Sequence, residues 1–152
     1  MEDRAKVAVL PPLIPLLAIG CGVLVHLAFP IALAPASIAT PLGALLILAA
    51  VLLVIAAARE LANAHTAFDV RKPTTNLVHS GVFRLSRNPV YFSMMLLCIG
   101  IALLANSLAM LLLSLPAGSG LCLFVIRQEE SYLERKFGNT YLDYKATVRR
   151  WI

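Results

Sequence analysis

Charged residues are scarce in this sequence, and they are unevenly distributed. Asp, Glu, Lys and Arg make up 14% of its 152 residues, whereas a soluble globular domain has about 25%. Residues 7–58 contain none of the four, and neither do residues 88–126. This composition excludes an ordinary soluble domain and is typical of a membrane protein.

Residues that form disulfides or bind metals are also few, with three cysteines and three histidines. They are Cys21, Cys98, Cys122, His26, His65 and His79. The cysteines lie in apolar runs without a Cys-x-x-Cys spacing, which excludes a disulfide framework. The histidines lack the spacing of zinc ligands, and no glycine-rich phosphate loop is present. The sequence therefore predicts no metal site.

The two uncharged windows are each long enough for two membrane-spanning helices of about 20 residues. Turn formers divide them, at residues 34–37 (APAS) in the first window and at residues 106–107 (NS) in the second. The sequence predicts an all-α fold: one membrane-embedded domain over residues 1–152 with four transmembrane helices. The predicted spans lie near residues 8–29, 38–58, 89–105 and 108–126.

The positions of the basic residues predict how the chain is oriented in the membrane. All 13 Lys and Arg fall on segments that four spans place on one side: the N-terminus, the loop 59–88 and the tail 127–152. By the positive-inside rule this side is cytoplasmic, so the net charge of +5 is a topology signal and does not indicate nucleic-acid binding. The first apolar stretch could instead be a signal peptide that is cleaved near residues 32–34, but the stretch is long for that purpose. The sequence predicts a multi-pass protein with both termini in the cytoplasm.

The cytoplasmic loop ends in HSGVFRLSRNPVYF, residues 79–92, where a new apolar helix must begin. Pro89 suits the first turn of a helix, so Asn88 is expected to be its N-cap and Tyr91 to lie at headgroup depth. On one interpretation Arg84 and Arg87 only mark the cytoplasmic side. On the other, they and the free N–H groups of the helix start form a carboxylate or phosphate site.

The tail carries an apolar stripe at helical spacing, and Gly138 is expected to end its first helix. The stripe consists of Leu133, Phe137, Tyr141, Tyr144, Val148 and Trp151. This pattern predicts an amphipathic helical segment on the inner leaflet. Glu129 and Glu130 do not fit such a surface, because the leaflet is anionic and a helix C-terminus disfavours carboxylates. Their partners are either nearby arginines or a ligand with an amino group or a ribose diol.

Two segments together resemble the isoprenylcysteine carboxyl methyltransferase and phospholipid methyltransferase superfamily. They are LVHSGVFRLSRNPVY (residues 77–91) and EESYLERKFGNTYLDYKATVRR (residues 129–150). The superfamily pattern runs LVxxGxY, Arg-(His or Asn)-Pro-x-Tyr, a helical hairpin, Glu-Glu, Phe-Gly and Tyr-x-x-Tyr, and every element is present in order. The preceding TAFDVRKPTTN is similar to the loop of bacterial members. The resemblance covers roughly residues 60–152 and implies an enzyme of the bacterial inner membrane.

The resemblance implies a methyltransferase that uses S-adenosylmethionine, bound at the cytoplasmic face between the loop, the last two spans and the tail. Because the donor is already activated, such an enzyme mainly aligns two partners and excludes water, and aromatic side chains could stabilise the sulfonium. Arg127 lies near the superfamily's substrate-side arginine, which implies a catalytic role for it. The implied cofactor-binding residues are Thr75, Asn76, Leu77, Val78, Gly81, Phe83, Arg87, Asn88, Pro89, Val90, Tyr91, Glu129 and Glu130.

The acceptor is expected to enter laterally from the bilayer, because a body of four helices has little room for a soluble substrate. The resemblance implies a lipophilic acceptor: an isoprenylcysteine carboxylate, a phospholipid headgroup or a hydrophobic thiol. Two alternatives stay open, a membrane reductase of the sterol-reductase type that binds NADPH and a non-catalytic membrane scaffold. Binding of S-adenosylhomocysteine, of NADPH or of neither separates the three.

Overall fold

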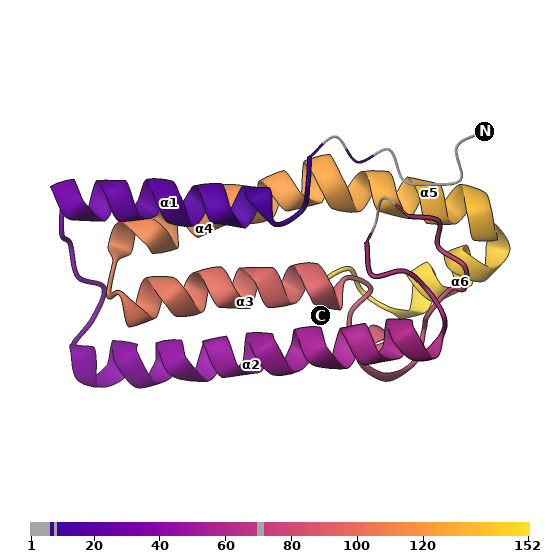
Figure 1. The fold of residues 1–152 in the computed structure, drawn as a ribbon, viewed down its shortest axis with the longest axis horizontal. Helices are drawn as coiled ribbons and strands as arrows, with labels where there is room; N and C mark the ends of the chain where they lie inside the picture. The colour runs from indigo at the N-terminus through magenta and orange to yellow at the C-terminus, as the bar shows by residue number, and fades with distance from the viewer. Residues whose placement is uncertain (1–6, 8, 70–71) are drawn as a thin grey trace.

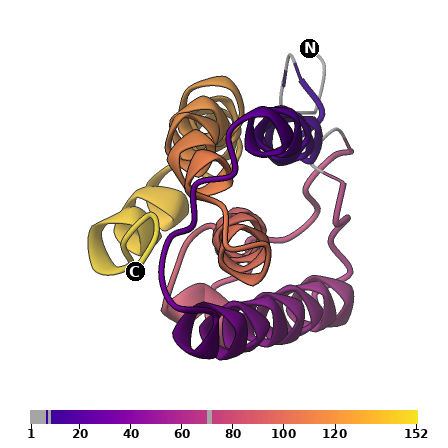
Figure 2. The same cartoon turned by 90° about the vertical axis from the view of Figure 1, so that its left-hand side faces the viewer.

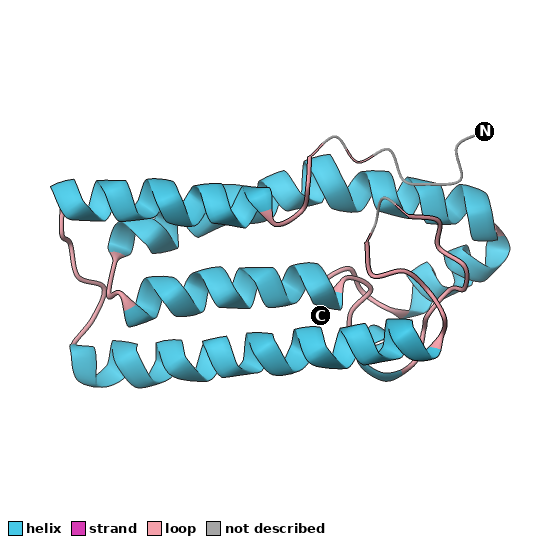
Figure 3. Ribbon diagram, viewed as in Figure 1, coloured by secondary structure: helices cyan, strands magenta, loops and turns pink. Residues whose placement is uncertain are grey.

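The computed structural model describes residues 7, 9–69 and 72–152, and within these ranges every regular element is helical (Figure 1, Figure 3). The all-α prediction is therefore confirmed for the described chain. In chain order the elements are α1 (Leu13–Ala28), α2 (Ala36–Asn63), the 3₁₀ turn η1 (Gly81–Arg84), α3 (Pro89–Leu104), α4 (Leu108–Leu121), the π-helical turn η2 (Cys122–Ile126), α5 (Arg127–Phe137) and α6 (Asn139–Thr147).

Two helices are long and apolar enough to cross a membrane. They are α2, with 28 residues, and the continuous helix Leu108–Phe137, with 30. The apolar helices α1 and α3 have 16 residues each, about 24 Å at 1.5 Å per residue, which is less than the roughly 30 Å of a hydrocarbon core. Each predicted span corresponds to an apolar helix, and the crossing of the membrane by α1 and α3 stays a prediction.

The outward faces of the bundle carry large apolar side chains. Leu17 of α1 is 70% exposed, and Leu45 of α2 is 60% exposed. Such side chains continue along both helices, and so large an exposed apolar surface is unfavourable in water. The outer surface of the bundle is therefore suited to lipid.

The four long helices run side by side, with α1 packed on α4 and α2 packed on α3 (Figure 1, Figure 2). Glycines allow the helices to approach closely, as is common between membrane helices. A Cβ atom at Gly43 would lie 2.8 Å from the carbonyl oxygen of Gly100, and one at Gly22 would lie 2.7 Å from Cγ of Met110. These three glycines thus serve packing within the chain, whereas a Cβ at Gly20 would meet nothing within 4 Å.

Replacing Gly43 with leucine is expected to lower the temperature of unfolding in detergent, because the new side chain would overlap the backbone of α3. Overpacking of this kind costs about 1–3 kcal/mol. Gly20→Leu is the matched control and should unfold at the wild-type temperature. Equal unfolding temperatures for the two variants would contradict the close approach of α2 and α3.

At one end of the bundle, the linker between α1 and α2 meets the turn between α3 and α4. Oδ1 of Asn106 accepts hydrogen bonds from the backbone N–H groups of Leu33 (2.9 Å) and Ala34 (3.2 Å), and Nδ2 of Asn106 donates to the carbonyl oxygen of Ala34 (2.9 Å). Asn106 has a φ of 47°, which asparagine tolerates better than most residues. The two breaks predicted at residues 34–37 and 106–107 therefore lie together.

At the opposite end, α4 continues through η2 into α5 without a break, and Gly138, with a φ of 54°, turns the chain into α6 (Figure 1). The predicted helix end at Gly138 is confirmed. The first part of the tail thus prolongs the last apolar helix, and the second part folds back towards the bundle. The last residues run along the start of α3, where the rings of Trp151 and Phe92 lie 6.5 Å apart. The position of the tail on the inner leaflet stays a prediction.

Candidate functional site

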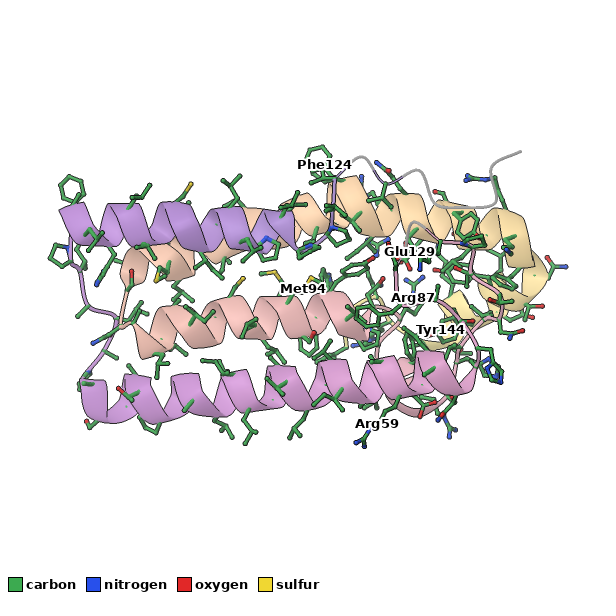
Figure 4. All side chains as sticks on the ribbon, in the orientation of Figure 1. Arg59, Arg87, Met94, Phe124, Glu129 and Tyr144 are labelled. Atoms are coloured by element: carbon green, nitrogen blue, oxygen red, sulfur yellow. The ribbon has the colours of Figure 1, made fainter. Side chains whose placement is uncertain are left out.

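A cavity of about 490 Å³ lies at the end of the bundle that carries the long loop and the tail. This volume is in the usual range for small-molecule sites. The residues just before α1, the helices α2, α3, α5 and α6, and the loop after α2 all contribute to its walls. Figure 4 shows Arg87, Glu129 and Tyr144 gathered at this end, whereas Arg59 and Phe124 point away from the bundle.

Glu129 provides a carboxylate in the cavity wall. Tyr91, in the first turn of α3, donates its O–H to Oε2 of Glu129 at 2.7 Å. The Tyr91 ring is only 6% exposed and packs with Leu121, Val125 and Ile126 of the last long helix. The tyrosine is thus held rigidly and orients the carboxylate. A carboxylate presented in this way is suited to a cationic or hydroxyl group of a ligand.

The start of α3 forms another part of the wall, and Asn88 occupies its N-cap position as predicted. Within the described chain the Asn88 side chain makes no capping hydrogen bond to this helix. Nδ2 of Asn88 instead donates to the carbonyl oxygen of Arg150 at 3.1 Å. The reason is that the end of the chain runs beside this helix start and offers a carbonyl oxygen to the amide.

Two tyrosines of α6 close the cavity from the side of the tail. Tyr141 is 1% exposed and Tyr144 is 8% exposed. The O–H group of Tyr144 donates to the carbonyl oxygen of Phe83 at 2.6 Å, which joins α6 to η1. Burial raises the pKa of Tyr141 to about 12, above the ordinary tyrosine value of about 10. These two members of the predicted apolar stripe face the chain's own cavity.

The loop that covers the cavity is tied to α2 and to α5. Oγ1 of Thr66 donates to the carbonyl oxygen of Asn76 (3.0 Å) and accepts from the backbone N–H of Asn76 (2.9 Å). Nδ2 of Asn76 donates to the carbonyl oxygen of Ala64 at 2.7 Å. The backbone N–H of Thr74 donates to the hydroxyl of Tyr132 at 3.2 Å. These bonds hold the loop against the end of α2 and against α5.

Ten of the thirteen implied cofactor residues line the cavity: Asn76, Leu77, Val78, Phe83, Arg87, Asn88, Pro89, Val90, Tyr91 and Glu129. The structure therefore brings together residues from three separate segments. Thr75 lies outside the lining and donates its hydroxyl to the carbonyl oxygen of His65 at 3.0 Å. Arg127 is exposed and is also absent from the lining. Gly81 has a φ of 53°, and a Cβ there would collide with the side chain of Glu60, which explains its glycine structurally.

Glu130 faces a cluster of two arginines. Its Oε1 accepts from Nε of Arg150 (3.0 Å), and its Oε2 accepts from Nη2 of Arg150 (2.6 Å). Nη1 of Arg87 lies 3.2 Å from Oε1. The Glu130 side chain is 6% exposed. Of the two interpretations of the acidic pair, arginine partners suit Glu130, and a ligand suits Glu129.

Several lining residues were missed by the sequence analysis. They are Leu10, Pro11, Pro12, Val54, Leu61, Thr66, Ala67, Phe68, Asp69, Thr74, Met94, Leu133, Tyr141 and Tyr144. A signal existed for the two tyrosines, because the Tyr-x-x-Tyr spacing is part of the motif, although it was assigned to the membrane-facing stripe. For the start of α1 no pattern in the sequence pointed to the cavity.

Long apolar helices and a cavity with both charged and aromatic walls at one end of the bundle are the features expected of a membrane protein with a small-molecule site. Among the described residues, no group of three or more His, Cys, Asp or Glu could hold a metal ion.

The phospholipid methyltransferase family matches residues 38–140, more than half of the chain. This protein therefore belongs to the phospholipid methyltransferase family. It is also similar to an uncharacterized protein of Haemophilus influenzae, with 39% identity over 71 residues, which cover 41% of this chain and 100% of that protein. No solved structure gives a significant match.

Proposed function

We propose that this protein transfers a methyl group from S-adenosylmethionine to a lipophilic acceptor in the membrane. The observation that carries the proposal is the convergence of ten motif residues on one cavity. The family match supports the reaction class. The motif resemblance supports the choice of donor.

The cavity wall suits the chemistry of this donor. Glu129 offers a carboxylate for an ammonium group or a ribose diol, and Tyr91 and Phe83 offer aromatic rings that favour a sulfonium. When bound, S-adenosylmethionine supplies an already activated methyl group. The chain's own residues then have to bind the two partners, align them and exclude water, and such positioning is a major source of catalysis. No covalent intermediate on the protein is required.

The apolar side of the cavity suits the acceptor. It is lined by Leu10 and Pro12 just before α1, by Val54 of α2 and by Met94 of α3. Leu10 is 40% exposed, so this side of the cavity lies next to the outer surface. We place the hydrocarbon part of the acceptor here, with its headgroup towards Glu129. An isoprenylcysteine carboxylate, a phospholipid headgroup or a hydrophobic thiol would each fit this arrangement.

The proposed topology places the cavity at the cytoplasmic face. The described Lys and Arg residues all lie on the loop, on the tail or at the adjacent end of α2, and none lies in the turns 29–35 and 105–107. The positive-inside rule then favours a cytoplasmic location for both chain ends. Four crossings of the membrane are part of this proposal.

Calorimetric titration of detergent-purified protein tests the proposal. S-Adenosylhomocysteine, the product of the donor, is expected to bind with a Kd in the micromolar range, and NADPH is expected not to bind. Incubation with methyl-labelled donor and membrane lipid extract should then move label into the lipid fraction. Binding of NADPH alone would favour a reductase. Folded protein that binds neither nucleotide would favour a scaffold.

A further inference from the structure

Arg87 is a buried cation whose hydrogen-bonding groups are not all used. Its side chain is 8% exposed and lines the cavity. Its Nε and Nη1 atoms have no hydrogen-bond partner within the described chain, although Nη1 lies 3.2 Å from a carboxylate oxygen of Glu130. Buried polar groups without partners are rare and costly in native proteins. The arrangement therefore indicates that a ligand completes the hydrogen bonds of this guanidinium.

Arg150 explains why Arg87 does not use Glu130 fully. The guanidinium of Arg150 donates to both carboxylate oxygens of Glu130, at 3.0 Å and 2.6 Å. These hydrogen bonds raise the pKa of Arg150, so it stays charged. One carboxylate thus faces two guanidinium groups, and the better placed one is Arg150. The charge of Arg87 is left only partly compensated.

The backbone of Arg87 is also fixed. Its N–H donates to the carbonyl oxygen of Arg149 at 3.0 Å, and the next carbonyl oxygen, that of Arg150, accepts from the hydroxyl of Ser86 and the amide of Asn88. Hydrogen bonds to the end of the chain therefore hold residues 86–88 in place. The Arg87 side chain emerges from a fixed point beside the cavity.

We infer that Arg87 is an oxyanion-binding group of the cavity and that Arg150 is a positioning residue that keeps Arg87 available by occupying Glu130. Arginine binds carboxylates and phosphates through paired N–H donors. The inference rests on the proposed function, in which the oxyanion is the carboxylate at the amino-acid end of the methyl donor, and Glu129 lines the same cavity for the neighbouring ammonium group. The phosphate of an acceptor lipid is the other source of the same chemistry.

The test compares two ligands that differ in the amino-acid end. S-Adenosylhomocysteine carries the carboxylate, whereas 5′-methylthioadenosine has the same adenosine and thioether without it. Calorimetry on wild type should show a preference for the first ligand. In Arg87→Gln the affinity for S-adenosylhomocysteine should fall by about tenfold to a hundredfold, the usual effect of losing hydrogen bonds to a charged group, and that for 5′-methylthioadenosine should stay unchanged.

Arg150→Gln tests the positioning role, because it does not change the cavity lining. Arg87 is then expected to pair with the freed Glu130, and the preference for S-adenosylhomocysteine should fall as in Arg87→Gln, with no further loss in the double variant. Arg149→Gln, at the exposed neighbour, removes the same charge and should keep the wild-type preference. Arg87→Gln leaves Glu130 paired with Arg150 and should fold, which thermal unfolding checks.

A second arm titrates a short-chain phosphatidylglycerol into wild type and Arg87→Gln. Weaker binding of this lipid by the variant, with an unchanged preference between the two nucleosides, would assign the oxyanion to the acceptor and support the site. Wild-type values for all three ligands in Arg87→Gln would overturn the inference while leaving the proposed function standing. Wild type that binds neither nucleoside would overturn the proposed function and the inference with it.

Discussion

Replacing Glu129 with glutamine is expected to weaken binding of S-adenosylhomocysteine by about 10-fold to 100-fold, with little change in stability. A hydrogen bond to a charged group contributes about 1.5–3 kcal/mol, and a neutral amide keeps the size of the side chain and an oxygen for Tyr91. The fold should survive because the wall around Glu129 is held by other contacts, including the bond from Tyr144 to Phe83. Calorimetry and thermal unfolding of the same sample measure the two effects.

Glu134→Gln is the matched control for this change. Glu134 lies on the same helix, pairs with Lys145 at the surface and is not part of the cavity lining. Its replacement should leave the Kd at the wild-type value. Tyr91→Phe should weaken binding by a smaller factor, because it removes only the group that orients Glu129. Unchanged affinity in both Glu129→Gln and Tyr91→Phe would show that this wall does not contact the nucleotide.

Replacing the neighbouring Glu130 should instead affect mainly the stability of the protein. Glu130→Gln is expected to destabilise the protein by about 3–5 kcal/mol, the usual cost of removing one partner from a buried ion pair. The change removes the carboxylate that lies 3.2 Å from Nη1 of Arg87 and partly compensates this buried charge, whose side chain is 8% exposed. Arg150 suffers less, because it is 31% exposed and water can solvate it. A large fall in the unfolding temperature in detergent would show the effect.

A double variant separates the buried charge from a general loss of packing. In Arg87→Gln with Glu130→Gln the buried charge of Arg87 is gone, and only the more exposed Arg150 lacks its anion. Removal of both members of a buried pair costs much less than removal of one. The double variant should therefore recover part of the stability lost in Glu130→Gln. If Glu130→Gln unfolds at the same temperature as Glu134→Gln, the ion pair makes no contribution to stability.

Much of the fold could be predicted because it depends on composition along the chain. Uncharged windows of sufficient length predict apolar helices, and local turn chemistry at residues 34–37, at residues 106–107 and at Gly138 predicts where they end. These signals act over a few residues, so they can be recognised without knowing which other helices the segment contacts. The motif residues were predicted in another way, from the resemblance to a known family, and the structure collects ten of them in one cavity.

The roles of the two glutamates could not be predicted, because they depend on a rotation that the sequence does not display. Between α4 and α5 the helix widens into the π turn η2, in which the backbone N–H of Arg127 donates to the carbonyl oxygen of Cys122. One additional residue in a turn rotates all later side chains by about 100°. The residues of this turn, CLFVI, are uniformly apolar, so the sequence pattern does not indicate that the helix widens here.

The sequence by itself therefore determined an apolar helical bundle and the ends of its helices, because each follows from local composition and spacing. Its resemblance to a known family gave ten of the residues around the cavity. Only the tertiary structure decided that Glu129 lines the cavity while Glu130 binds Arg150, and that Arg87 keeps donors without partners beside the cavity. These facts depend on the π turn and on the end of the chain returning to the start of α3. The return of the chain end is a long-range contact, and the π turn lies in a uniformly apolar stretch, so no local pattern specifies either of them.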